Sequence, residues 1–190
     1  PIDDAAARAA ETSVLKSPTG KVEVSFSLGA DGAAVYSVSF RGKPVVADSR
    51  LGLTLRQIGP LASGFRVLDV KRASRDEAYT LVAGKTREAR DRCEEMTVAL
   101  ERPGDKPVRL DVVFRAFDDG AAFRYVLPKQ PGLDRVEITS EDTRFRFLAD
   151  HKAWVLQLAS FDTSNEREFV PMPLLGIGTG AIVGPPLTIE

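Results

Sequence analysis

The residues in this sequence that could do chemistry are mainly carboxylates. Asp162, Glu166 and Glu168 lie in one polar stretch, residues 160–168, which follows the single tryptophan, Trp154. Clustered carboxylates in a loop can hold a hard cation such as Ca²⁺, which takes about six to eight oxygen ligands. On residue types alone these side chains are typical of solvated loop acids, and calcium binding is the alternative.

Two other acidic pairs have a structural interpretation. Asp118 and Asp119 could in principle act as paired acids, but Gly120 follows them between two runs of alternating apolar residues. An Asp-Gly step in that setting is typical of a β-hairpin turn. Glu94 and Glu95 come just before an apolar run, and we interpret them as a solvated edge. We expect neither pair to be catalytic.

Other kinds of catalytic centre lack their residues. The sequence holds one histidine, His151, and one cysteine, Cys93, whereas a zinc site normally needs several such ligands at defined spacing. A Ser-His-Asp triad would have to use His151, which we predict to be a surface loop residue. Residues 176–180 are glycine-rich but lack the strand-then-helix context of a dinucleotide fingerprint, so they predict a flexible loop.

Composition excludes two classes of partner. The chain has 26 Lys and Arg against 27 Asp and Glu, a net charge of −1, and nucleic-acid binding usually leaves a basic excess. No apolar run approaches the roughly 18 residues that suggest a membrane span.

Residues 1–4 are not the basic and apolar start of a signal peptide. A cytosolic protein and an exported protein whose signal has been removed both fit.

The elements that must position these residues are strands. Val22, Val24, Phe26 and Leu28 alternate with polar residues, a period of two that is typical of a half-buried strand. The same period predicts a hairpin over 108–127, and shorter strands at 36–40, 45–46, 51–55, 65–70, 79–83, 96–100, 145–147 and 154–158. Many short strands between Gly and Pro turns favour an all-β sandwich or barrel.

The two ends of the chain differ from this pattern. Residues 1–15 are alanine-rich, and we interpret them as a leader that is disordered or forms one helical turn. Residues 172–190 are rich in glycine, proline and apolar side chains. We interpret this tail as chain that leads into more protein and packs against it.

Several segments together resemble a known family. Residues 114–128 read FRAFDDGAAFRYVLP and are similar to the core motif of the N-terminal domain of glycoside hydrolase family 97. The similarity continues in register from about 17 to 173. It includes residues 17–21, 36–53, 141–145 and the Ala153-Trp154 pair.

The resemblance implies an architecture and a role. It implies a large antiparallel β-sandwich of the galactose-mutarotase-like type over 16–190, a domain of a secreted or periplasmic α-glucosidase or α-galactosidase. The partners would be the enzyme's own (β/α)8 barrel, which carries the catalytic carboxylates, and an oligosaccharide or α-glycoside substrate. No catalytic residue is then expected in this chain, and the chain alone is expected to be inactive.

The resemblance also implies a metal. Family enzymes bind calcium beside the scissile sugar, with one carboxylate ligand from the N-terminal domain in a Glu-x-x-aromatic setting. Glu166-Arg167-Glu168-Phe169 fits that setting, so Glu166 is the predicted ligand and Glu168 the second choice. The family's Trp-Gly-Glu segment is Ala83-Gly84-Lys85 here, and this departure leaves the substrate preference open.

Two other functions are weighed against this one. A standalone carbohydrate-binding β-sandwich needs exposed aromatic side chains as sugar platforms. Six aromatic residues fall on predicted strand faces with aliphatic neighbours and are expected to be core: Phe26, Tyr36, Phe40, Phe114, Phe123 and Tyr125. Sugar epimerisation of the mutarotase type uses histidine and glutamate as acid and base, and His151 is the single histidine available.

Overall fold

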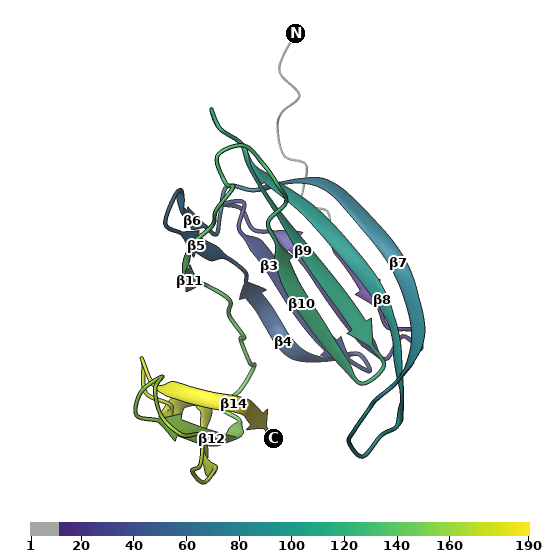
Figure 1. The fold of residues 1–190 in the computed structure, drawn as a ribbon, viewed down its shortest axis with the longest axis vertical. Helices are drawn as coiled ribbons and strands as arrows, with labels where there is room; N and C mark the ends of the chain where they lie inside the picture. The colour runs from purple at the N-terminus through teal and green to yellow at the C-terminus, as the bar shows by residue number, and fades with distance from the viewer. Residues whose placement is uncertain (1–11) are drawn as a thin grey trace. The chain divides into compact units, whose positions relative to one another are not determined.

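The computed structural model describes residues 12–190, which form strands and one short 3₁₀ helix (Figure 1). The chain divides into two compact units, one that ends at Arg146 and one from Phe147 to Glu190. No helix among residues 12–190 is long and apolar enough to cross a membrane. The prediction of an all-β chain is confirmed.

The first sheet of the first unit comes from the start of the described chain. Its four strands are antiparallel in the order β1-β2-β3-β4. They are β1 (Ser13–Lys16), β2 (Val22–Leu28), β3 (Ala34–Phe40) and β4 (Lys43–Arg50). Val22, Val24 and Phe26 are buried while the residues between them are partly exposed, as the period of two predicts.

The second sheet holds the longer strands. Its order is β10-β9-β8-β7. The strands are β7 (Arg66–Thr80), β8 (Glu88–Arg102), β9 (Val108–Phe117) and β10 (Gly120–Val126). The predicted hairpin is confirmed, because β9 and β10 pair in unbroken register from Phe117↔Gly120 to Asp111↔Val126.

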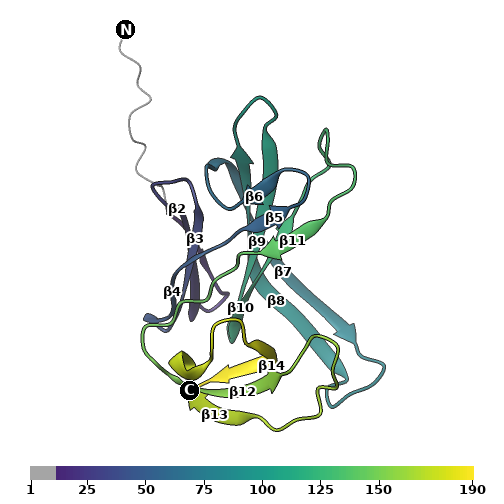
Figure 2. The same cartoon turned by 90° about the vertical axis from the view of Figure 1, so that its left-hand side faces the viewer.

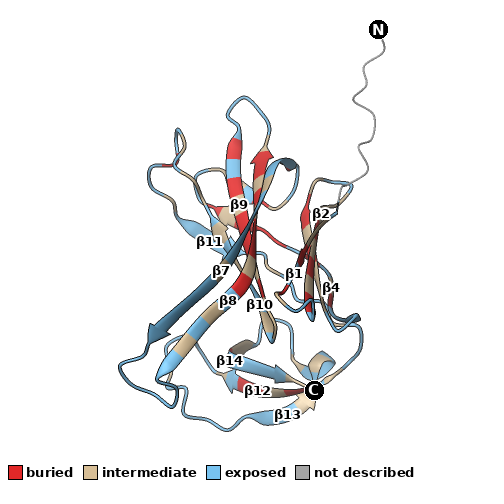
Figure 3. Ribbon diagram, turned by 90° about the vertical axis from the view of Figure 1, so that its right-hand side faces the viewer, coloured by how far each residue is buried: buried red, intermediate tan, exposed pale blue. Residues whose placement is uncertain are grey.

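These two sheets are the layers of a sandwich, as Figure 2 shows. Aromatic side chains join the layers: the Phe26 ring of β2 lies 5.9 Å from Phe114 of β9, and Tyr36 of β3 lies 5.3 Å from Phe123 of β10. Such pairs add about 0.5–1.5 kcal/mol beyond the area they bury. Figure 3 shows buried residues concentrated in β2, β8 and β9 and exposed residues along β7.

This unit has a third, small sheet, and side-chain hydrogen bonds connect the segments that flank it to the sandwich. Its order is β11-β5-β6, with β5 (Leu53–Leu55), β6 (Gly59–Leu61) and β11 (Ile138–Glu141). Tyr125 Oη accepts a hydrogen bond from the Gly52 amide at 3.0 Å and lies 2.7 Å from Thr143 Oγ1. Tyr36 Oη donates to the Arg144 carbonyl at 2.9 Å. These bonds satisfy the polar ends of two largely buried rings.

The second unit is one antiparallel sheet in the order β13-β12-β14. It comprises β12 (Lys152–Leu158), β13 (Val170–Pro173), the 3₁₀ helix η1 (Leu174–Gly176) and β14 (Ile182–Ile189). The tail contains a strand that the sequence did not predict: Ile182–Ile189 pairs with β12 although it contains two prolines. As an outer strand, β14 can accommodate proline because its second edge needs no ladder bonds.

Other predictions need correction. The two short strands expected at 65–70 and 79–83 are one strand, β7, and the strand at 145–147 is only a bridge between Ala47 and Arg146. The middle of β7 was not predicted as strand, because the charged stretch 71–77 shows no apolar alternation. Residues 1–11 of the expected leader lie outside the described residues, and residues 13–15 belong to β1.

Candidate functional site

The predicted metal ligand lies in the loop between β12 and β13, residues 159–169. Glu166 and Glu168 are both exposed there, and neither carboxylate forms an ion pair or hydrogen bond with another described residue. Phe161 is 93% exposed and Phe169 is 39% exposed in the same loop. Asp162 in the same loop is also exposed, and its carboxylate has no such partner either, so the loop presents three carboxylates and two aromatic rings to the solvent.

This loop does not make a calcium site by itself. No group of three or more His, Cys, Asp or Glu side chains is arranged to hold a metal ion among residues 12–190. Ca²⁺ takes about six to eight oxygen ligands. The carboxylate oxygens of Glu166 have the right chemistry for calcium, but the described chain supplies too few partners for them.

Asp118 and Asp119 form the turn of the β9–β10 hairpin, as predicted. Asp118 Oδ1 accepts hydrogen bonds from the Thr19 hydroxyl at 2.6 Å and the Thr19 amide at 2.8 Å. These bonds hold the pKa of Asp118 below its ordinary value. The carboxylate thus joins two turns that lie 99 residues apart in sequence, which is a structural role.

The interpretation of Glu94 and Glu95 as a solvated edge is wrong. Both lie inside β8, and Glu95 is 9% exposed. Its carboxylate accepts hydrogen bonds from Arg115 Nε at 2.8 Å and Arg75 Nε at 3.0 Å. Burial raises the pKa of Glu95, but the two arginine hydrogen bonds outweigh burial and hold the pKa below its ordinary value. We name Arg75, Asp91, Glu95 and Arg115 the β7–β9 ion network.

The single histidine and cysteine are not arranged for catalysis. His151 lies in the loop before β12, as predicted, with its ring 6.4 Å from that of Phe147. Cys93 is buried in β8, and burial raises the pKa of its thiol. A raised pKa keeps the thiol protonated and poorly nucleophilic.

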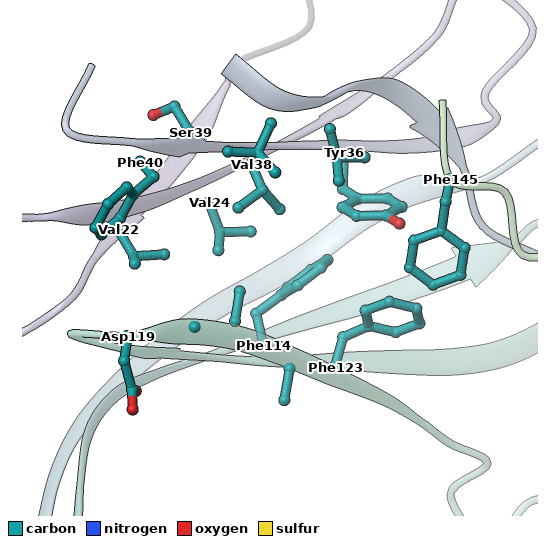
Figure 4. A pocket seen from close by; sticks show the side chains of 15 residues that line it. Val22, Val24, Tyr36, Val38, Ser39, Phe40, Phe114, Asp119, Phe123 and Phe145 are labelled. Atoms are coloured by element: carbon teal, nitrogen blue, oxygen red, sulfur yellow. The ribbon is translucent and has the colours of Figure 1, made fainter. Parts of the chain in front are cut away.

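A cavity that the sequence did not predict lies between the two large sheets. It has a volume of about 350 Å³ and is lined by residues of β2, β3 and β4, of the β9–β10 hairpin, and by Phe145. Figure 4 shows valines and aromatic rings from both sheets facing this space, which we call the apolar groove. Its lining is Val22, Val24, Tyr36, Val38, Ser39, Phe40, Val45, Val46, Phe114, Asp119, Gly120, Ala121, Ala122, Phe123 and Phe145. Alternation predicted six of these residues as core, namely Val22, Val24, Tyr36, Phe40, Phe114 and Phe123, and it gave no sign of a cavity between the sheets.

Exposed aromatic rings do not form a row on any one strand. Phe26, Tyr36 and Phe114 are buried, as predicted, whereas Phe40 is 39% exposed at the end of β3 and was wrongly placed in the core. Tyr79 lies far along β7 and Phe145 follows β11. Among the described strands, none carries two of the exposed rings.

Comparison with known proteins places the chain in a family. The sequence model described as glycosyl-hydrolase 97 N-terminal matches residues 15–190. A protein named "Probable retaining alpha-galactosidase", from Streptomyces bingchenggensis strain BCW-1, is 33% identical over 149 residues, which are 78% of this chain and 22% of that protein. This chain thus spans about a fifth of the length of that relative.

Solved structures agree with this result. A glycoside hydrolase family 97 enzyme from Pseudoalteromonas sp. strain K8, in complex with acarbose, matches with a TM-score of 0.82 and 29% identity, over 94% of this chain and 26% of that one. A variant of an enzyme from the same strain, in complex with panose, gives a TM-score of 0.70 at 30% identity, over 78% and 22%. A β-arabinopyranosidase gives 0.68 at 30% identity, over 76% and 22%. The expected β-sandwich is also the fold of the matched part of these enzymes, and the chain belongs to the glycosyl hydrolase 97 N-terminal family.

Proposed function

We propose that this chain is the non-catalytic N-terminal domain of a calcium-dependent, exo-acting α-glycosidase of the α-glucosidase or α-galactosidase type. In the parent enzyme it packs on the catalytic (β/α)8 barrel, lines the sugar pocket and donates one calcium ligand. One observation carries the proposal: a family match over residues 15–190 to enzymes of which this chain covers only 22–26%. The proposal includes a periplasmic or secreted location, which follows from the family resemblance.

The described carboxylates support a non-catalytic role. Glycoside hydrolysis uses two carboxyl groups, about 5–5.5 Å apart in retaining enzymes and about 6.5–9.5 Å apart in inverting ones. Asp118, Glu95 and Glu101 are each held by hydrogen bonds or ion pairs within the domain. Among the residues that line the apolar groove, Asp119 is the one carboxylate. A lone carboxylate cannot supply both an acid and a base.

The loop between β12 and β13 supports the metal part of the proposal. Glu166 is exposed and has no partner among the described residues, so its carboxylate is available to an ion held mainly by another part of the parent enzyme. Bound calcium would act as a Lewis acid or as an ion that orients the substrate. Glu168 is the second choice and offers a matched control, because it lies in the same loop and is also exposed.

The experiment compares this chain with the full-length enzyme. Aryl α-glucoside, α-galactoside and β-arabinopyranoside are offered to both, with and without a calcium chelator, since the neighbouring enzymes differ in their sugars. We expect an inert chain beside an active parent that the chelator inhibits. Turnover by the chain alone, or chelator-insensitive turnover by the parent, would overturn the proposal.

A substitution then tests the ligand. Glu166→Gln in the parent should raise the calcium concentration needed for half-maximal activity by roughly 10-fold or more, since a neutral amide replaces a charged ligand. Glu168→Gln should leave that concentration within about 2-fold, because it changes the same charge without removing the proposed ligand. The melting temperature of the calcium-free protein should be equal in both variants. Equal calcium requirements would exclude Glu166 as the ligand.

A further inference from the structure

We propose that β10 is a docking edge, where an extended segment of the parent polypeptide from outside this chain pairs as an additional strand and closes the apolar groove. The inference rests on the proposed function in one respect, that this chain is part of a larger enzyme. The occupant is a strand with apolar side chains on one face and an acidic side chain on the other.

The first argument is that β10 lacks the features that protect an edge. Exposed edges are normally blunted by short strands, charged residues, proline or bulges. Across the two large sheets, β1 has only four residues, β4 carries Pro44 and register shifts, and β7 is rich in charged side chains. In contrast, β10 has seven residues, a regular register and one charge, Arg124.

The second argument is that the free edge of β10 has no backbone partner. β10 is the last strand of its sheet, and its backbone makes no hydrogen bond outside the β9 ladder to any other residue of the first unit's described range, 12–146. The nearby segment 142–146 bonds instead to the other side: the Arg144 amide donates to Arg50, and the Arg146 carbonyl accepts from Ala47. A strand that pairs with β10 would satisfy these backbone groups, as in β-strand addition.

The third argument is that this edge borders the apolar groove. On the inner face of β10, Phe123 lines the groove with Ala121. Three other residues of the lining keep exposed surface: Phe40 is 39%, Val45 47% and Phe145 58% exposed. Figure 4 shows Phe123 and Phe145 side by side at one end of the groove, with their ring centroids 6.3 Å apart. Because side chains alternate along a strand, every second residue of an added strand would enter the groove.

The fourth argument concerns charge on the outer face. Arg124 lies on that face, opposite Val113, and its guanidinium makes no ion pair or hydrogen bond with another described residue. An acidic residue on the added strand would complement it. A second copy of this chain fits less well, because symmetric pairing of two β10 strands would bring two unpaired Arg124 side chains onto one face, and like charges across strands destabilise a sheet. The matching enzymes have the additional chain that is needed: this chain covers only 22–26% of them.

The test is amide hydrogen exchange, measured residue by residue across β10 in this chain and in the full-length parent. Neighbouring amides of an antiparallel strand point alternately to the two sides. The amides of β10 that point away from β9 should exchange roughly 100-fold or more slowly in the parent. Equal exchange rates in the two proteins would overturn the inference. Protection in this chain alone that grows with its concentration would also overturn it, because the occupant would then be a second copy.

Two proline variants provide a matched pair. Ala121→Pro and Ala122→Pro remove neighbouring amide donors, one directed at β9 and the other at the free edge. The variant that removes the amide directed at β9 should lower the melting temperature of both proteins, because it breaks a ladder bond. The variant that removes the amide directed at the free edge should lower the melting temperature of the parent and leave that of this chain nearly unchanged. If neither variant showed this difference between the two proteins, the inference would be wrong.

Glycosidase assays on the same parent sample separate the two proposals. An active, chelator-sensitive parent with unprotected β10 amides would refute the docking edge alone. A protected β10 in a parent without glycosidase activity would refute the proposed function and support the edge.

Discussion

Replacing Glu95 with glutamine should destabilise the domain, although the substitution preserves the shape of the side chain. The Glu95 carboxylate accepts hydrogen bonds from Arg115 Nε at 2.8 Å and from Arg75 Nε and Nη2 at 3.0 and 3.3 Å. Hydrogen bonds to charged groups contribute about 1.5–3 kcal/mol each. The two arginines keep 28% and 35% of their side-chain surface exposed, which lets water replace part of the loss.

We therefore expect Glu95→Gln to lower the free energy of unfolding by about 2–3 kcal/mol at pH 7, and the melting temperature by about 5–10 °C. Urea unfolding followed by circular dichroism measures the change. Glu94→Gln is the matched control: it alters the same charge one residue away, where the carboxylate accepts a hydrogen bond from Ser74 on the surface. The control should cost less than about 0.5 kcal/mol.

The stability that Glu95 contributes should depend on pH in a defined direction. The pKa of Glu95 is lower in the folded protein than in the unfolded chain, so its contribution is complete above the ordinary carboxyl pKa. That contribution is lost as the pH falls through the lowered folded value. The stability difference between the wild-type protein and Glu95→Gln should therefore shrink below about pH 4. A difference that matched the Glu94→Gln control at pH 7, or that grew in acid, would refute the assigned role of the β7–β9 ion network.

Two further predictions concern packing and backbone geometry. Phe114→Ala should lower the free energy of unfolding, measured with urea, by about 3–5 kcal/mol, because its ring is buried against those of Phe26, Tyr36 and Phe123. Phe161→Ala is the control, because its ring is 93% exposed, and it should change the free energy of unfolding by less than about 0.5 kcal/mol. Similar costs for the two variants would contradict the placement of the core. Gly32→Ala should cost about 2–4 kcal/mol, because Gly32 has φ +69° and an added Cβ would lie 2.8 Å from the Phe65 amide nitrogen. Gly42→Ala, at φ +76° with no atom within 4 Å of the added Cβ, should cost only about 1–2 kcal/mol, and an equal loss in the two variants would show that the close approach at Gly32 has no effect.

Local signals in the sequence predicted the parts of the fold that local physics determines. The period of two identified β2 and the β9–β10 hairpin, because each of these strands has one buried and one exposed face. The middle of β7 could not be predicted in this way. Its stretch 71–77 lies at an exposed edge and carries no apolar alternation. It is a strand because β8 pairs with it from Arg66↔Glu101 to Thr80↔Glu88.

The environment of a carboxylate was harder still to predict. Glu94 and Glu95 are adjacent and identical in type, and only the register of β8 distinguishes them. That register places Glu95 opposite Arg115 on β9, within reach of Arg75 on β7, while Glu94 faces the other side of the sheet. The bond between Asp118 and Thr19 likewise spans 99 residues. Tertiary pairing determines such contacts, and one sequence does not show it.

Three places in the described chain have groups without a partner within it. The sandwich uses Glu95, Glu101 and Asp118 to connect its own strands and turns. In contrast, the Glu166 loop has carboxylates without partners, the β10 edge has backbone groups without a ladder, and the apolar groove is open beside that edge. A solvated monomer gains nothing from an unprotected edge beside an open apolar groove, since both favour association. The two proposals made above, a strand of the parent polypeptide that covers the edge and groove and a calcium ligand role for Glu166, would account for this combination.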